Sequence, residues 1–244
     1  MKSLLSFIIL ILMVNILNAQ LWTEKVKTEK GDLSISMIGW ATLKLEYNGK
    51  IIYVDPSDKG GSYDNLPKAD LIFLTHTHFD HLNIGIIQQL LKKDTKLIIT
   101  EEISYVIKDA IKNNKLIILP NNNNSEIDGI KFTTVPAYNM GGEKIYHEKG
   151  KNNGYIFHFV NLNLLIAGDT ENIPELKSLK DISIAFLPLN RPYTMDENMF
   201  VDLVKSMKPK IVYPYHYDSN TVEKVKELLA DSKETELRVK PISK

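Results

Sequence analysis

Short apolar runs separated by polar turns dominate the chain from residue 33 onward, and they predict strands interspersed with helices. Residues 42–47 alternate apolar and polar side chains, which is the period of a half-buried strand. Asn48-Gly49 is a hairpin turn signal, and 51–54 predicts the returning strand. Residues 71–74 are instead continuously apolar, which is typical of a strand that is buried on both faces.

The rest of the chain continues this order and shows no domain boundary. Further strands are predicted at 33–38, 96–100, 116–119, 130–135, 155–160, 164–166, 182–187 and 211–213. Helices are predicted at 84–91, 103–111, 197–207 and 221–229, and the polar residues 121–124 predict a loop. Two sheets with helices outside them would accommodate this order, so we predict one domain over residues 20–244.

The first twenty residues differ in character from the rest. Lys2 is a short basic start, residues 4–17 are mostly apolar, and Ala19 offers a small residue for cleavage. This is the pattern of a secretory signal peptide over residues 1–19. The apolar stretch is short for a membrane span, which needs about 20 residues. We therefore expect an exported protein, periplasmic or secreted, without stable membrane insertion after cleavage; an uncleaved anchor is the alternative.

Composition narrows the choice of partner. The chain has 244 residues, of which 43% are hydrophobic, and it contains no cysteine, so it forms no disulfide. A chain of this size can bury one sizeable core without disulfides. Its 30 basic and 30 acidic residues balance. A chain with balanced charge lacks the excess of basic residues that is typical of nucleic-acid-binding proteins, so we expect a small-molecule substrate. The oligomeric state stays open.

Three of the six histidines lie within six positions, in Thr75-His76-Thr77-His78-Phe79-Asp80-His81. This segment joins the apolar run 71–74 to the predicted helix 84–91, where the chain leaves the sheet and is free to curl around an ion. Imidazole and carboxylate groups are ligands that Zn²⁺ takes in catalytic sites. The alternative is a polar helix start that Asp80 caps, with solvated histidines.

The motif His-x-His-x-Asp-His after a buried strand resembles the signature of the metallo-β-lactamase superfamily. The order of other motifs agrees: Gly39-Trp40-Ala41-Thr42, Asp55-Pro56, Gly168-Asp169-Thr170 and His216. The resemblance covers about residues 33–220. It implies an α+β fold, a four-layer αββα sandwich, with metals at one edge of the two sheets.

The resemblance also implies a ligand set, with two zinc ions as the expected cofactors and other divalent metals as alternatives. His76 and His78 would bind the first ion, and Asp80 and His81 the second. Asp169 would bridge both ions, and His216 would complete the second site. Considered alone, Asp169 would equally suit an Asx-turn, and His216 a packed surface position.

The chain departs from the family pattern where another histidine usually completes the first site. Here the sequence is Val135-Pro136-Ala137-Tyr138-Asn139, and a neutral amide is a poor zinc ligand. We therefore expect Asn139 to contact substrate. His147, in His147-Glu148-Lys149-Gly150, resembles a loop histidine of one branch of the family and is the candidate replacement; a solvated loop residue is the alternative. His158 falls in a predicted strand, and we expect a structural role for it.

A second segment, 188–195, resembles the Pro-x-Gly-x-Tyr-Thr-Met loop of a lactonase-like branch of the family. Arg191 and Tyr193 are its candidate substrate contacts, with structural roles as the alternative, and Asp196 or Thr194 would cap the following helix. Trp40 cannot bind metal, so we expect it to pack beneath the site or line the pocket.

These motifs predict a hydrolase that attacks a small ester, lactone or phosphoester with hydroxide made available by the metal. Asp80 would accept a hydrogen bond from the nucleophile and later carry its proton. Because fold alone does not choose a reaction, a non-catalytic metal- or ligand-binding module derived from such an enzyme is the alternative.

Overall fold

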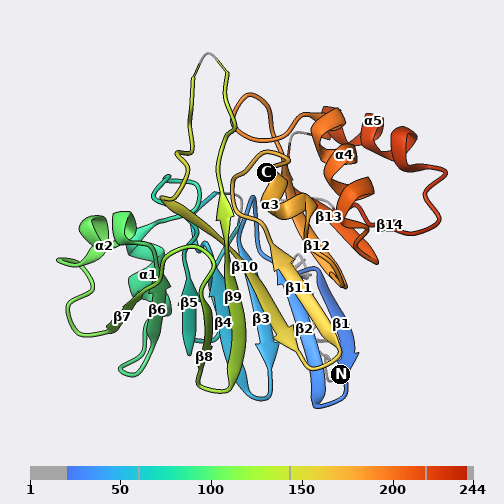
Figure 1. Ribbon diagram of the computed structural model, residues 1–244. Helices are drawn as coiled ribbons and strands as arrows, with labels where there is room; N and C mark the ends of the chain where they lie inside the picture. Colours follow the sequence, from blue (N-terminus) through green and yellow to red (C-terminus); the bar gives the residue numbers. More distant parts are fainter. Residues whose placement is uncertain (1–20, 60, 143, 218, 241–244) are drawn as a thin grey trace, which may run out of the picture.

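The computed structural model describes residues 21–59, 61–142, 144–217 and 219–240. Within these residues the strands form two seven-stranded sheets, each with its strands in sequence order (Figure 1). The first sheet contains β1 (Thr23–Thr28), β2 (Gly31–Met37), β3 (Leu43–Tyr47), β4 (Lys50–Val54), β5 (Leu71–Phe73), β6 (Lys96–Ile99) and β7 (Lys115–Ile118). The second contains β8 (Asn124–Ile127), β9 (Ile130–Ala137), β10 (Asn152–Phe159), β11 (Leu162–Ile166), β12 (Ile184–Leu189), β13 (Ile211–Tyr217) and β14 (Glu236–Leu237).

The two sheets are built alike. Strands β1 to β4 pair antiparallel and β4 to β7 pair parallel, and the same change from antiparallel to parallel occurs at β11 in the second sheet. Parallel neighbours need crossover connections. Most of these contain a helix: α1 (Ile84–Leu90), α2 (Glu101–Ile107), α3 (Pro174–Lys177), α4 (Glu197–Met207) and α5 (Ser219–Leu229).

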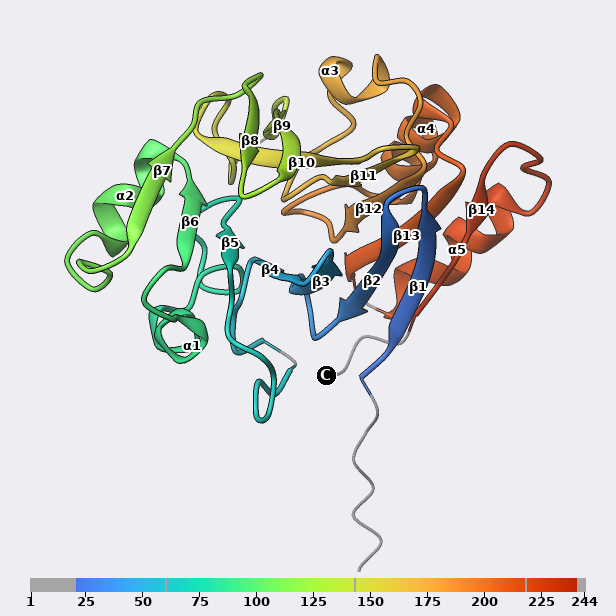
Figure 2. The ribbon, with the colours of Figure 1, turned by 90° about the horizontal axis from the view of Figure 1, so that it is seen from below.

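The layers follow from this connectivity. Figure 2 shows α1 and α2 on one side of the strands and α4 and α5 on the opposite side. The expected four-layer αββα sandwich is therefore confirmed. In β5, Leu71 and Phe73 face the core between the sheets, whereas Ile72 packs under α1 and α2. The continuous apolar run is thus buried on both faces, as predicted.

Aromatic side chains join the two sheets at the centre. The ring of Phe73 in the first sheet makes edge contacts with Phe132, Tyr155 and Phe157 in the second, with centroid distances of 4.9, 5.0 and 4.8 Å. All four side chains are almost completely buried. The loops that follow the strands at one edge of the sandwich are therefore held on a rigid base.

Several elements were not predicted. Strand β1 carries the mostly polar sequence Thr-Glu-Lys-Val-Lys-Thr, strand β14 is two residues long, and α3 is a single turn. Strand β8 begins at Asn124, within the segment predicted as a loop. The turn after this strand could have been recognised from the sequence, because Asp128-Gly129 is a hairpin signal. In the structure both residues have positive φ, 51° and 81°.

Helix starts are also defined by local hydrogen bonds. The Asn83 side chain caps α1 by accepting from the backbone N–H of Ile86, so the alternative in which Asp80 caps this helix is wrong. Asp196, not Thr194, caps α4. The predicted signal peptide lies outside the described residues. No helix among the described residues is long and apolar enough to cross a membrane.

Candidate metal centre

The candidate ligands meet where strands of both sheets end at one edge of the sandwich. The segment His76–His81 follows β5, Asp169 follows β11, and His216 lies near the end of β13. Side chains at the carboxyl ends of parallel strands share one edge of a sheet, which is where open α/β sheets bind ligands. Residues far apart in the chain are therefore brought together by strand order.

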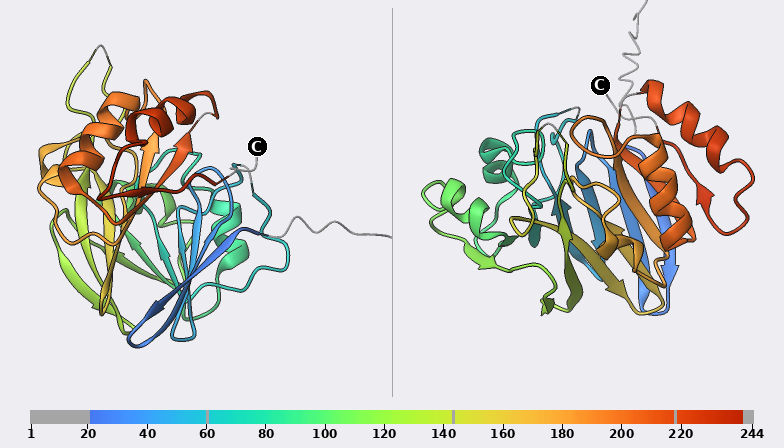
Figure 3. Two further views of the ribbon diagram at one scale, coloured as in Figure 1. Left: turned by 90° about the vertical axis from the view of Figure 1, so that its right-hand side faces the viewer. Right: turned by 45° about the horizontal axis from the view of Figure 1, so that its top comes forward.

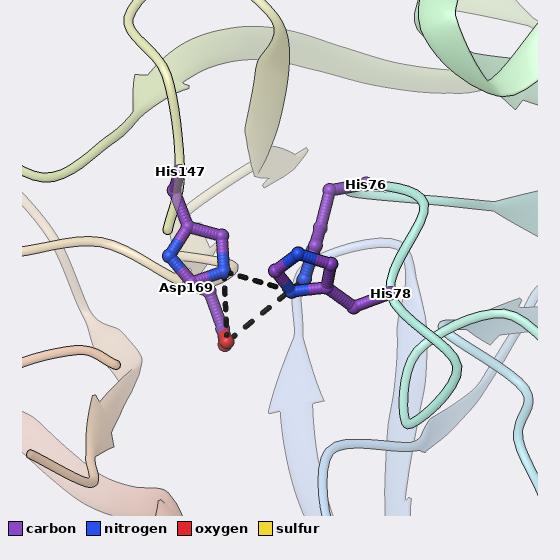
Figure 4. A group of neighbouring side chains, drawn as sticks. All are labelled: His76, His78, His147 and Asp169. Carbon is purple, nitrogen blue, oxygen red and sulfur yellow. Dashed lines mark hydrogen bonds and ion pairs between the residues drawn. The ribbon is translucent and has the colours of Figure 1, made fainter. Parts of the chain in front are cut away.

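The predicted metal-binding residues form two adjacent groups. The first contains His76, His78, His147 and Asp169, and the second contains Asp80, His81 and His216. Within each group the candidate ligand atoms lie within 4.8 Å of one another. Figure 4 shows the four side chains of the first group facing one another from three separate segments. His78 is the most exposed of the four.

Asp169 links the two groups. Its Oδ2 lies 3.3 Å from His147 Nε2, 3.4 Å from His216 Nε2 and 3.9 Å from His76 Nε2. Its Oδ1 lies 3.2 Å from His81 Nε2. One carboxylate thus contacts imidazoles of both groups, which is the arrangement expected of a bridging ligand.

Unpartnered polar atoms test whether these residues suit a metal. His76 Nε2, His81 Nε2 and Asp169 Oδ1 are buried and make no hydrogen bond to any described residue. Buried polar atoms in proteins almost always have a hydrogen-bond partner. Imidazole nitrogen and carboxylate oxygen aimed at one point are a suitable donor set for a divalent cation such as Zn²⁺. The residues therefore fit a metal centre.

Asp55, at the end of β4, orients one ligand in each group and is completely buried. Its Oδ2 is 2.7 Å from His81 Nδ1 and accepts a 2.7 Å hydrogen bond from the Thr75 hydroxyl. Since that hydroxyl donates to Asp55, it accepts from His76 Nδ1 at 2.9 Å. Each ring then carries its proton on Nδ1, which leaves Nε2 free for a metal.

Electrostatics differ sharply between neighbouring imidazoles. Burial and the charge of His81 lower the pKa of His76 well below its ordinary value, which favours the neutral, metal-binding form. Burial also disfavours charge on His81, but Asp169 and Asp55 on its two sides outweigh this and raise its pKa well above the ordinary value. The two carboxylates beside the His81 ring favour a positive charge there, which a cation bound at Nε2 would supply.

The carboxylates themselves are held ionised. Burial alone would raise the pKa of Asp169, yet the charges of His216 and His81 lower it well below the usual range. For Asp80, burial is likewise outweighed, mainly by a hydrogen bond from His216, and its pKa falls to about 2.

A β-bulge turns His216 toward the centre. Tyr215 pairs with Pro188 and Tyr217 with Leu189, so His216 is the extra residue on β13, and its φ is 50°. Its backbone N–H donates to Trp40 O at 2.9 Å, and the Trp40 ring lies 4.9 Å from the His216 ring. Trp40 thus packs against a candidate ligand, as predicted.

The remaining predicted site residues lie around this centre. Asn139 is 5% exposed, and its Oδ1 accepts from the backbone N–H of His147 and lies 3.1 Å from His147 Nδ1. Tyr193 is 45% exposed and its ring lies 4.8 Å from that of Tyr146, while Arg191 pairs with Asp196 at 3.2 Å. Substrate contacts by these residues stay predictions.

His158 has the structural role that was expected. Its Nδ1 lies 2.8 Å from Asn163 Oδ1 and its Nε2 lies 2.8 Å from Thr133 Oγ1.

Sequence reasoning missed two buried acids. Asp55 was noted only as part of the Asp55-Pro56 motif, although an acid that directly follows a buried strand is a candidate for a ligand-orienting carboxylate. Glu171, two residues after Asp169, accepts from the backbone N–H of Met140 at 2.8 Å, and nothing in the sequence pointed to that contact.

Comparisons with known proteins agree with this arrangement. A family model for the beta-lactamase superfamily domain matches residues 34–216. A relative from Lysinibacillus sphaericus, named UPF0173 metal-dependent hydrolase, is 30% identical over 213 residues, which are 82% of this chain and 92% of the relative. A crystal structure from Parabacteroides distasonis, provisionally named a metal-dependent hydrolase, is 39% identical, has a TM-score of 0.82 and covers 91% of this chain and 99% of that one.

A more distant structure, the metallo hydrolase Igni18 from Ignicoccus hospitalis, shares the fold with a TM-score of 0.72 at 21% identity, over 87% of this chain and 96% of that one. The matched region spans every candidate ligand from His76 to His216. The sandwich, the ligand order and these matches together show that the chain belongs to the metallo-β-lactamase superfamily.

Proposed function

We propose that this protein is a metal-dependent hydrolase with two divalent metal ions, zinc being the expected metal. The observation that carries the proposal is the convergence of five histidines and two aspartates into two adjacent groups linked by Asp169. The hydrolase names of the relatives support the same reaction class. When bound, two such ions supply a water of lowered pKa, about 7, and polarise the bond to be cleaved.

Asp80 is the side chain best placed to handle a proton at this centre. Its carboxylate lies 3.1 Å from His216 Nε2 and is less buried than Asp169. With a pKa of about 2 it is ionised at neutral pH, so it can accept a hydrogen bond from the attacking nucleophile. The proposal therefore assigns Asp80 both a ligand and an acceptor role.

The surroundings of the centre favour a small substrate with an apolar portion. Phe79, between the ligands His78 and Asp80, is 72% exposed, and Met140 and Ile145 on the loop that leads to His147 are about half exposed. Lys59 Nζ lies 5.2 Å from the Trp40 ring and 5.7 Å from the Phe79 ring, so a cation adjoins these aromatic rings. An ester, lactone or phosphoester with an apolar group suits this mixture.

The test combines metal content with hydrolysis. We expect the purified protein to bind about two zinc ions per chain and to hydrolyse members of an ester, lactone and phosphoester panel. His78→Ala should lower metal content and abolish hydrolysis with the fold intact, as judged by circular dichroism. His158→Ala is the matched control and should leave metal content unchanged, because that ring is bonded to Asn163 and Thr133.

The alternative makes a different prediction. A non-catalytic metal- or ligand-binding module would bind metal but hydrolyse nothing in the panel. That result would refute the proposed hydrolase while leaving the metal centre in place.

Export is a separate proposal that rests on the first twenty residues alone. We expect the mature chain to begin at Gln20, which mass spectrometry of the protein from its native compartment would check.

A further inference from the structure

His147 reaches the centre from a loop and not from the end of a strand. The loop between β9 and β10 rises above the sheets (yellow-green in Figures 1 and 3). By sequence, His147 belongs to the second half of this loop. A ligand on such a loop needs a specific contact to bring its nitrogen to a fixed point. The structure offers one contact partner at the start of the same loop, Asn139.

The orientation of the Asn139 amide is fixed by groups that can only donate or only accept. Its Oδ1 accepts from the backbone N–H of Tyr146 at 3.1 Å and of His147 at 2.8 Å. Its Nδ2 donates to the carbonyl oxygen of Tyr193 at 3.0 Å. Exchanging the amide oxygen and nitrogen would place donor against donor and acceptor against acceptor, so only one orientation is possible.

This orientation determines which nitrogen of His147 carries the proton. His147 Nδ1 lies 3.1 Å from Asn139 Oδ1, which is an acceptor, so Nδ1 must be the protonated nitrogen. The other nitrogen, Nε2, is then free as a lone-pair donor. It lies 3.2 Å from His78 Nδ1 and 3.3 Å from Asp169 Oδ2, inside the first group of candidate ligands.

A buried acid, Glu171, fixes the position of Asn139. Glu171 is 8% exposed and accepts from the backbone N–H of Met140, the residue after Asn139. Its second oxygen lies 3.5 Å from Asn139 Nδ2. Asn139 is therefore fixed from three sides, by its own loop, by Glu171 beyond β11 and by Tyr193 beyond β12.

We propose that Asn139 is a positioning residue that makes His147 a metal ligand, an inference that rests on the proposed metal centre. This role differs from the substrate contact that the sequence suggested for Asn139, and it is favoured because both polar atoms of the side-chain amide have partners within the protein. Tyr193, in contrast, contributes a backbone carbonyl to this contact and keeps its ring exposed.

A double-mutant cycle on zinc affinity tests the inference. We expect Asn139→Ala to weaken one zinc equivalent about 10- to 100-fold in a chelator competition, as loss of a ligand-orienting partner does. His147→Ala should weaken the same equivalent at least as much. Adding Asn139→Ala to His147→Ala should then cost nothing further, because the first residue acts only through the second.

The chain contains its own control. Asn163 Oδ1 lies 2.8 Å from His158 Nδ1, and Asn163 Nδ2 donates to a carbonyl, so the same kind of Asn–His pair exists away from the centre. Asn163→Ala should leave both zinc affinities unchanged. Wild-type affinity in Asn139→Ala, or a further loss in the double variant, would overturn the positioning role.

A second readout needs no metal. In ¹⁵N spectra of metal-free protein, neutral His147 should be the Nδ1–H tautomer in the wild type and a tautomer mixture in Asn139→Ala. An Nε2–H tautomer in the wild type would refute the inference directly. A wild type that binds no zinc but shows the expected tautomer would refute the proposed function and leave the Asn139–His147 contact supported.

Discussion

Replacement of Asp55 by asparagine removes one negative charge from beneath the metal centre and leaves the shape of the side chain nearly unchanged. Asp55 Oδ1 accepts from the Thr75 backbone N–H at 2.8 Å, and Oδ2 faces the Thr75 hydroxyl and His81 Nδ1, both at 2.7 Å. The backbone N–H requires an oxygen at the Oδ1 position. The new NH₂ group would therefore face His81 Nδ1.

Two donors cannot share that contact, so His81 must move or transfer its proton to Nε2. Either change removes the lone pair that faces Asp169. Loss of a ligand-orienting partner lowers metal affinity about 10- to 100-fold, which corresponds to about 1.4–2.8 kcal/mol. Loss of the charged hydrogen bonds should also lower the free energy of unfolding by about 1.5–3 kcal/mol.

The assay is zinc affinity by chelator competition together with urea denaturation of the metal-free protein. Asp128→Asn is the matched control, because Asp128 has φ 51° and Asp55 has φ 50°, yet Asp128 lies away from the metal centre and forms an ion pair with the half-buried Lys96. We expect the control to change both quantities little. Wild-type zinc affinity in Asp55→Asn would refute the argument that this carboxylate sets the state of His81.

Three further predictions concern stability. Gly168→Ala should lower the free energy of unfolding, measured by urea denaturation, by about 1–3 kcal/mol, because φ is 67° and a Cβ would lie 3.2 Å from that of Thr75. An unchanged midpoint would contradict this. Phe73→Ala should cost about 3–5 kcal/mol in the same assay, since it empties the centre of the core, and a loss below 1 kcal/mol would count against that packing. Burial opposes ionisation of Asp70, but hydrogen bonds from the Ile51 N–H and the Lys92 ammonium outweigh it and lower its pKa below 3.8. The stability it contributes is therefore present above about pH 4 and is lost as pH falls through the folded-state pKa. Asp70→Asn should therefore reduce acid destabilisation below about pH 4, and equal pH dependence in both proteins would refute this.

The pattern of the sequence predicted most of the fold because each signal was local. The alternation at 42–47, the Asn48-Gly49 turn and the buried run 71–74 all correspond to observed strands or turns. Polar edge strands such as β1 lack the apolar period, so pairing with β2 stabilises them and only the folded sheet reveals them.

The candidate ligands were predicted from their spacing and from resemblance, because the His76–His81 segment places several metal-binding groups on one turn. Sequence spacing could not show how Asn139 is used, since its partners His147, Glu171 and Tyr193 come from three different segments.

Hydrophobic period and side-chain chemistry are properties of short segments, so the order of strands and helices and the chemical types of the ligands could be predicted from the amino-acid sequence. Which polar atoms meet is a property of the folded sandwich. Asp55 beneath His81 and the bulge that turns His216 inward join strand ends that are distant in the chain, whereas the Asn139 contact that orients His147 joins the two sides of one loop. Such contacts depend on strand order and loop path, and these are fixed by packing of the whole sandwich.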